Sequence, residues 1–407
     1  MAGTLTFEYQ VRDRAGKVVS GKLEADSPAT VATKLKSMGY APVRITQSNA
    51  GMKKEMKLPG FGPKVKLKDL AIFSRQFSTM INSGLSMLRS LSILEDQTSN
   101  KKLAAVLGEV RADIEAGSSL SIAMGKHPED FPPLMTNMIK AGEVGGFLDQ
   151  VCLQLADNFE AEVRLRGKVK AAMTYPVVVL VMAMLMSTAM LLFVVPTFAG
   201  LFTSLGGELP APTKLLMALS DFLKVAIIPL IVLSIVGFFV WGKVKRTDQV
   251  RNVVDPLKLK IPVFGGLFQK IALARFCRNL GTMLYSGVPI LHSLDIVADT
   301  SGNVVIARAV RDVQESVRNG ESLSLPLSHH PVFPAMVVQM LAVGEDTGAL
   351  DSMLHKISDF YDQEVESTTE SLTALIEPLM IAFLGGIVGA MIIALYMPIF
   401  KIFDLIK

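Results

Sequence analysis

Two short acidic turns hold the side chains whose types and spacing could do chemistry. Each begins with Gly-Glu, ends with Leu-Asp and has glycine in between. Carboxylates and backbone carbonyls are the ligands that a hard cation prefers, so one interpretation is a cation or partner contact. The other is structural, because glycine permits a tight turn between helices and an aspartate favours a helix N-terminus. The four carboxylates are Glu143, Asp149, Glu345 and Asp351.

Patterns typical of enzymes are missing from the chain. It has no GxxxxGK[ST] phosphate-binding loop, so any ATP hydrolysis would belong to a partner. It has neither an HExxH motif nor a GxSxG elbow, and its 5 histidines lack metal-ligand spacing. The 2 cysteines, Cys152 and Cys277, lie far apart, which predicts two buried thiols in a reducing compartment. We therefore predict no enzyme activity, no catalytic residue, no metal and no cofactor.

Composition favours a membrane over nucleic acid as the surface that the protein contacts. The 407 residues are 50% hydrophobic, and 41 basic and 37 acidic residues are mixed along the chain. Such mixing makes no nucleic-acid footprint, whereas a small basic excess beside apolar runs is typical of contact with membrane lipid.

Three apolar segments are long enough to cross a membrane. A span needs about 20 mostly apolar residues, and a soluble core helix of that length would have a charged face. None of the three has a charged residue in its middle, which argues against an ion pathway, a transporter or an intramembrane enzyme. The predicted spans are 171–202, 225–241 and 374–400.

Basic flanks predict the orientation of these spans. Lysine and arginine mark the cytoplasmic side, whereas the connection at 203–224 balances its charges and is expected outside. The chain begins without a signal peptide, so we expect the N-terminus in the cytoplasm and, after three crossings, the C-terminus outside. The topology determinants are Arg164, Arg166, Lys168 and Lys170 before the first span, and Lys243, Lys245 and Arg246 after the second.

A small-residue face lies in the third span. Gly385 and Gly389 are four residues apart and therefore share one face of a helix. Such faces let two helices approach closely in lipid, although glycine is also common in membrane helices by chance. We predict helix packing at this face and no role in transport.

An internal repeat organises the rest of the chain. The segment FSRQFSTMINSG at 73–84 recurs as FCRNLGTMLYSG at 276–287, an offset of 203 residues. The acidic turns recur at an offset of 202, from 142 to 344, which one deleted residue explains. Apolar residues within the unit follow helical spacing, and roughly 100 residues make a domain. We predict two antiparallel bundles of about six helices each.

The fold class expected is a mostly α, polytopic membrane protein with two homologous cytoplasmic helical-bundle domains and three transmembrane helices. A small β-β-α-β module precedes them, because two alternating stretches, the helix start Ser27-Pro28 and the stop Gly39 follow one another. In chain order the predicted segments are the module 1–46, a linker 47–65, the first repeat domain 66–170, the first span 171–202, an extracytoplasmic connection 203–224, the second span 225–241, a cytoplasmic connection 242–268, the second repeat domain 269–373, the third span 374–400 and an extracytoplasmic tail 401–407.

The combined pattern resembles the secretion-system F family, the inner-membrane platform proteins of type IV pilus and type II secretion machines. Nearly the whole chain takes part, and its motifs are specific in combination. The second domain departs from the first at Thr347, where the first has Gly145. The motifs are Phe73-x-Arg75-x4-Met80-x3-Gly84, Met173-x-Tyr175-Pro176 and Glu377-Pro378.

The resemblance implies a non-enzymatic scaffold in the inner membrane. Such a protein would couple a hexameric pilus or secretion ATPase to insertion and extraction of pilins or pseudopilins. It would also contact other inner-membrane assembly proteins and form homo-oligomers, with no role in nucleic-acid binding. We expect type IV pilus assembly, with type II secretion as the alternative. A membrane transporter is disfavoured, because transporter repeats are the spans themselves.

Overall fold

A computed structural model describes residues 5–12, 18–25, 28–37, 41–47, 64–204, 209–244 and 247–405. Contacts divide the chain into two units, residues 1–63 and 64–407, and each is described by itself. Residues 48–63 of the predicted linker 47–65 lie outside the described residues.

The N-terminal unit is a three-stranded antiparallel sheet with one helix. Strand β1 is central and pairs with β2 from Leu5↔Ala25 to Arg12↔Val18, and with β3 on its other side. Val31 and Leu35 of the helix are buried together with Ala25. The order of elements is the β-β-α-β order predicted. The elements are β1 (Leu5–Arg12), β2 (Val18–Ala25), α1 (Pro28–Ser37) and β3 (Ala41–Gln47).

The second unit begins with a bundle of six helices around an apolar core. Asn100 starts α4 because its side chain accepts the N–H groups of Lys102 and Leu103. The rings of Phe73 and Phe77 stack at 5.5 Å inside the core. The helices are α2 (Leu67–Asn82), α3 (Met87–Gln97), α4 (Lys101–Glu115), α5 (Leu120–Gly125), α6 (Pro133–Gly145) and α7 (Leu148–Ala189).

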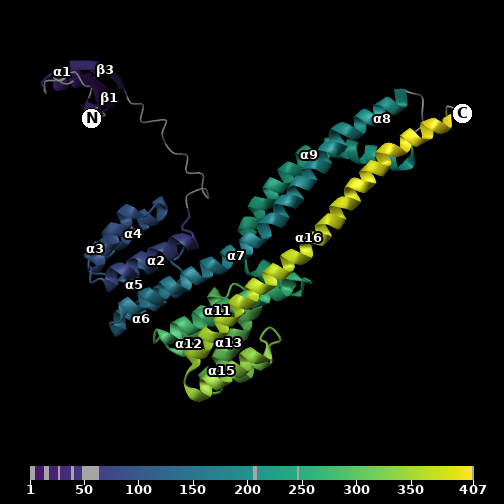
Figure 1. The fold of residues 1–407 in the computed structure, drawn as a ribbon. Helices are drawn as coiled ribbons and strands as arrows, with labels where there is room; N and C mark the ends of the chain where they lie inside the picture. The colour runs from purple at the N-terminus through teal and green to yellow at the C-terminus, as the bar shows by residue number, and fades with distance from the viewer. Residues whose placement is uncertain are drawn as a thin grey trace. The chain divides into compact units, whose positions relative to one another are not determined.

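A second bundle repeats this arrangement (Figure 1). Asn303 accepts an N–H group at the start of α13, as Asn100 does in α4. The rings of Phe276 and Phe333 lie 5.3 Å apart, and their equivalents Phe73 and Phe131 lie 6.3 Å apart. The helices are α11 (Phe264–Tyr285), α12 (Ile290–Thr300), α13 (Val304–Arg318), α14 (Ser324–Ser328), α15 (Ala335–Thr347) and α16 (Leu350–Leu405), and α10 (Asp248–Lys260) precedes them.

Three helical stretches among the described residues are long and apolar enough to cross a membrane. The first joins α7 to α8 (Val195–Ser204) through a π-helical turn, η1 (Met190–Val194). Pro196, just beyond that turn, has no N–H to donate to the preceding turn, which explains the local change of hydrogen bonding. The second is α9 (Ala211–Val244), and the third is the C-terminal part of α16.

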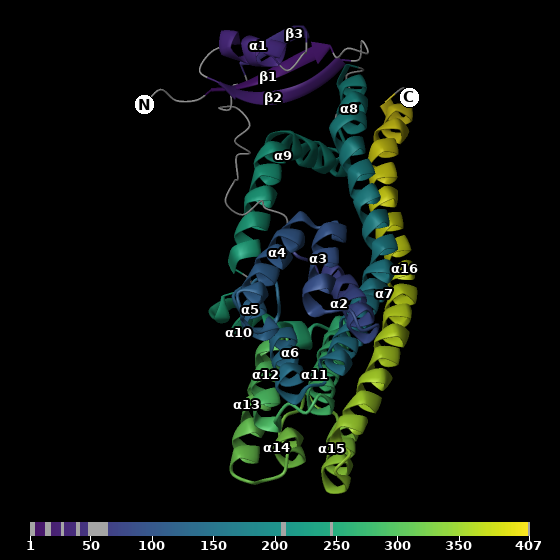
Figure 2. The same cartoon turned by 90° about the vertical axis from the view of Figure 1, so that its left-hand side faces the viewer.

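The two bundles each share one unbroken helix with a membrane-spanning segment. Helix α7 belongs to the first bundle and α16 to the second, and the two lie side by side in both views (Figures 1 and 2). Helix α9 begins at Ala211, inside the range 203–224 expected as a connection. Pro212 suits the first turn of a helix, and Lys224 pairs with Asp221 at 2.9 Å on its exposed surface.

Candidate functional sites in the repeat domains and spans

The glutamates of the two acidic turns cap short helices. Glu143 reaches from α6 to the start of α5, where its carboxylate accepts the N–H of Leu120 at 2.6 Å and that of Ser121 at 3.1 Å. The first N–H groups of a helix lack intrahelical partners, and a negative charge there is favourable. Glu345 binds the N–H of Leu323 at 2.8 Å in the second bundle. The recurrence of this glutamate in both repeats therefore has a structural explanation.

The glycines of the acidic turns have separate tasks. Gly146 and Gly348 end their helices with φ of +74° and +66°, a conformation that favours glycine. A Cβ on Gly142 would lie 3.0 Å from Val151, so this glycine lets α6 approach α7 closely. The turn predicted between two helices is present in both bundles.

The two turns differ at a second position besides Gly145 and Thr347. A Cβ on Gly145 would lie 1.9 Å from the ring of Phe147, so no larger residue fits there. The second bundle has Ala349 where the first has Phe147, and the ring that excludes a side chain is absent. Thr347 is therefore compatible with the same turn.

The aspartates of the turns lie in the first turns of α7 and α16. Asp149 is exposed, and Asp351 is half-buried. No group of three or more metal-ligand side chains occurs in the described part of the chain. The cation or partner contact at Glu143, Asp149, Glu345 and Asp351 stays a prediction.

The basic flank of the first span is partly paired. Glu162 accepts a bond from Arg166 at 2.5 Å, and Lys168 forms an ion pair with Glu366 of α16 at 2.5 Å. Arg164 and Lys170 are exposed. On the other flank, Lys245 and Arg246 and the side chain of Lys243 lie outside the described residues.

The small-residue face of the third span has no neighbour among the residues that the structure describes. A Cβ added to Gly385 or Gly389 would meet no described atom within 4 Å. The contacts of α16 with the other spans use a different face, where Met391 packs with Leu191 and Val195. The predicted packing partner of the glycine face is thus not another segment of the described chain.

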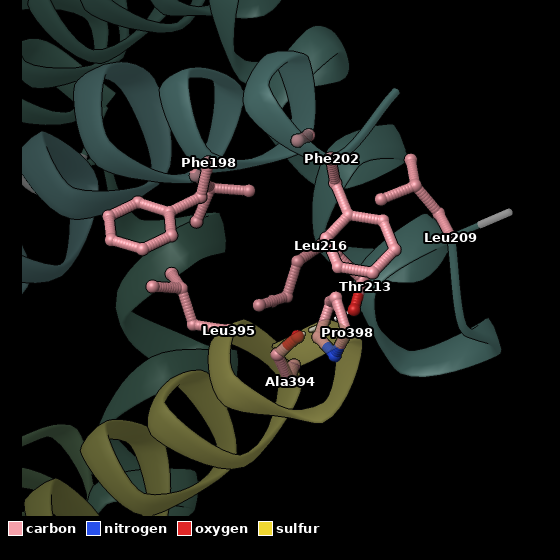
Figure 3. A pocket seen from close by; sticks show the side chains of 10 residues that line it. Phe198, Phe202, Leu209, Thr213, Leu216, Ala394, Leu395 and Pro398 are labelled. Carbon is pink, nitrogen blue, oxygen red and sulfur yellow. Dashed lines mark hydrogen bonds between the residues drawn. The ribbon is translucent and has the colours of Figure 1, made fainter. Parts of the chain in front are cut away.

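A hydrogen bond joins α9 to α16 between the spans. Thr213 is buried, and its hydroxyl donates to the carbonyl of Ala394 at 2.5 Å (Figure 3). Pro398 stands four residues after Ala394 and has no N–H, so that carbonyl lacks its helical donor. A small apolar cavity of about 20 Å³ lies beside this bond. Sequence reasoning missed Thr213, although Pro398 inside the third span indicated that the carbonyl of Ala394 would lack a helical donor.

Polar side chains also join the two bundles. The Asn158 amide donates to Asn279 at 3.3 Å and to Thr282 at 3.1 Å, and all three side chains are buried. Ser286 donates to Gln154 beside them. Sequence reasoning missed this contact, although Asn158 on the repeat helix stands where the second repeat has Phe360.

A cleft of about 330 Å³ lies at the edge of the contact between the bundles. His292 of α12 bonds Asn137 of α6 at 2.9 Å on one side, and Phe147 lies on another.

The two cysteines lie elsewhere and are buried, as predicted, with Cys277 fully covered. Burial raises the pKa of the Cys277 thiol, so it stays protonated and unreactive.

The chain belongs to the type II secretion system protein F family. The family model "Type II secretion system (T2SS), protein F" matches residues 73–196 and again 276–398, so each match spans one bundle and the apolar helix that follows it. The model "Type II secretion system protein F, N-terminal domain" matches residues 1–46. The resemblance to this family is confirmed.

Individual relatives match almost the whole chain. "Type IV pilus assembly protein PilC" of Thermus thermophilus is 45% identical over 97% of this chain and 98% of its own length. The protein of the same name from Myxococcus xanthus is 41% identical over 98% of this chain and 95% of its own. "Type II secretion system protein F" of Vibrio cholerae is 32% identical over 98% of this chain and 99% of its own.

Proposed function

We propose that this protein is a non-enzymatic platform of type IV pilus assembly in the inner membrane. Relatives named for type IV pilus assembly, at 45% and 41% identity, support this more strongly than the type II secretion relative at 32%. A platform of type II secretion is the alternative within the same family. A transporter is disfavoured because each repeat is a helical bundle followed by one apolar helix rather than a set of spans.

The observation that supports this role best is the continuity of two helices. The first stretch runs for 57 residues from the first bundle to the end of α8, and α16 runs for 56 residues. No loop separates bundle from span in either, so displacement of a bundle would displace its span as a rigid rod. A platform that passes force from a cytoplasmic motor to membrane subunits needs such a connection.

The partners follow from this role. A hexameric pilus ATPase would act on the bundles, while pilins and other assembly proteins would meet the spans in the lipid. The glycine face at Gly385 and Gly389, which meets no other described part of the chain, is suited to a pilin helix or to another span. The exposed Asp149 offers a contact at the opposite end of α7.

The proposed topology places both bundles, 66–170 and 269–373, in the cytoplasm. The N-terminus would lie there too, and the C-terminus would lie outside. Support comes from the basic residues just before the apolar part of α7 and just after the apolar part of α9. A reporter that is active only outside the membrane, fused after Lys407, should be active, and the same reporter fused before residue 66 should be inactive. The reverse pattern would contradict the topology.

The first experiment is a pull-down from detergent-solubilised membranes by a tagged full-length chain, read by mass spectrometry. We expect an ATPase of the pilus class together with pilins. Recovery of a secretion ATPase with pseudopilins would favour the alternative. Recovery of neither, where a known complex of the same membrane survives, would overturn the platform role.

A further inference from the structure

The two bundles contact each other through unequal faces. The first bundle contributes α6 and α7, from which Asn137, Gln154 and Asn158 reach across. The second contributes α11 and α12, with Thr282, Ser286 and His292, and also α16, which packs along α7. The equivalent helices α7 and α16 contact each other, but beyond them each bundle uses a different surface, and this part of the contact is heterologous. The surface on the first bundle is called the α6–α7 face here, and the surface on the second bundle the α11–α12 face.

Each bundle is a copy of the other and so has both kinds of face, one of which the chain leaves unused. In the first bundle, the equivalent of the α11–α12 face lies on α2 and α3. In the second bundle, the equivalent of the α6–α7 face lies on α15 and α16. The residues equivalent to those of the contact are all exposed. They are Thr79, Ser83 and Arg89 on the first bundle and Gln339, Lys356 and Phe360 on the second.

The unused face of the first bundle is built like the used face of the second. The Thr282 hydroxyl donates to the carbonyl of Arg278, and the Ser286 hydroxyl to that of Thr282. Thr79 and Ser83 make the same two bonds one bundle earlier, to the carbonyls of Arg75 and of Thr79. The backbone and hydroxyl pattern that receives a neighbour is thus present and uncovered.

The side chains on the two unused faces also suit each other. His292 bonds Asn137 within the chain, and the equivalents are Arg89, a donor, and Gln339, whose amide oxygen accepts. The buried amide Asn158 is replaced by Phe360, an exposed ring at 42%. By the same equivalence Phe360 would lie against Gln76 and Thr79, the counterparts of Asn279 and Thr282. Burying this exposed aromatic ring favours association.

Charge follows the same equivalence. Within the chain, Lys168 of α7 pairs with Glu366 of α16. Lys168 corresponds to Glu370 of the second bundle, and Glu366 corresponds to Arg164 of the first. The pair expected between two copies is therefore again one acid and one base. Both are exposed, and neither forms an ion pair in the described part of the chain. A second copy would bring these opposite charges together.

The membrane permits this arrangement. Helices α7 and α16 run side by side from their bundles into the spans in the same direction (Figures 1 and 2). Both bundles therefore lie on the same side of the membrane, as the bundles of two copies in one membrane would.

We propose that the α15–α16 face of one copy binds the α2–α3 face of a second copy of this chain, and so repeats the contact between the bundles. The proposal specifies the surface of the homo-oligomer included in the family role. One face of each kind remains free after every addition, so the assembly closes as a ring or grows.

The test is disulfide cross-linking of two full-length chains, differently tagged and expressed together in membranes. One has Thr79→Cys and the other Phe360→Cys, and both native cysteines are buried. We expect a cross-link between the two tags, several-fold more than when exposed Lys101→Cys replaces Thr79→Cys. Two Thr79→Cys chains should not cross-link, because the contact is not isologous. A cross-link no stronger than the Lys101→Cys control, or one between two Thr79→Cys chains, would overturn the proposal.

A charge exchange gives a second reading of the same contact. Glu370→Arg and Arg164→Glu should each weaken the cross-link several-fold, and both changes together should restore it. Failure of the double variant to recover would also count against the proposal. Cross-linking reads the contact itself, so its failure would leave the role in pilus assembly to be decided by the pull-down.

Discussion

At the residue scale, two glutamates at equivalent positions do the same structural work. In the sequence, Glu143 and Glu345 are acidic side chains in glycine-rich turns, a pattern that suggests a cation site. The structure directs both carboxylates to the N–H groups that start a short helix in the same bundle. Because α5 has only 6 residues and α14 only 5, neither helix has many bonds of its own, and the cap matters more.

Removing such a cap should destabilise the protein. Glu143→Ala deletes the acceptors of the Leu120 and Ser121 N–H groups, and we expect a loss of about 1–2 kcal/mol in the free energy of unfolding. Thermal unfolding of the protein in detergent measures it, with exposed Glu129→Ala as the matched control. Unchanged unfolding with a lost partner contact would instead assign Glu143 to binding.

A pair of residues explains how the two turns differ. Gly145 with Phe147 and Thr347 with Ala349 are alternative solutions of the same turn. We expect Gly145→Thr to destabilise the protein by about 1–3 kcal/mol, because its Cβ would overlap the Phe147 ring. Adding Phe147→Ala recreates the second-bundle pair and should recover part of the loss. Strictly additive effects of the two changes in thermal unfolding would contradict this coupling.

At the element scale, the spans are joined by a bond that a proline makes necessary. Helix α16 continues past Pro398, and the carbonyl of Ala394 has to find a donor outside its own helix. Thr213 of α9 supplies it. In lipid no water can take the place of that donor, so the bond also fixes the position of α9 along α16.

Thr213→Val should loosen this junction. The substitution keeps the shape of the side chain and removes the donor, and we expect a loss of about 0.5–2 kcal/mol in the free energy of unfolding in mixed micelles. Thr213→Ser should keep most of the stability. In a Pro398→Ala background, residue 398 can donate its own N–H, and Thr213→Val should then have little effect. An equal loss in both backgrounds would show that the hydroxyl acts in another way.

At the scale of the whole molecule, two similar bundles are each rigidly connected to a span and joined by an asymmetric contact. The continuous α7 and α16 each connect a bundle directly to a span, and the polar contact centred on Asn158 joins the two bundles. A platform that converts motor action into movement of membrane subunits requires both features.

Breaking one route should separate assembly of the complex from its action. A four-residue Gly-Ser insertion after Lys170 would replace helix by flexible chain between bundle and span. We expect the variant to recover its ATPase partner in the pull-down and to abolish surface pili in cells that have no other copy of the gene. The same insertion in the predicted linker 47–65 is the control. Normal piliation of the Lys170 variant would exclude rigid transmission through α7.

Much of the architecture could be predicted from the sequence, because it depends on local patterns. Helical periodicity, the repeated motif beginning at Phe73 and Phe276, and apolar runs without charge each act within a short stretch of chain. The caps at Asn100 and Asn303 and the helix ends at Gly146 and Gly348 are equally local. The three long apolar helices and the six-helix repeats therefore follow from the order of residues alone.

What only the tertiary structure decided are the contacts between distant segments. Thr213 with Ala394 lies 181 residues apart in the chain, and Asn158 with Thr282 lies 124 apart. No periodicity specifies which of two homologous faces meets the other, because both bundles have both faces. Packing of the whole unit selects one combination and leaves the other exposed, and that choice is a property of the assembled chain rather than of any segment.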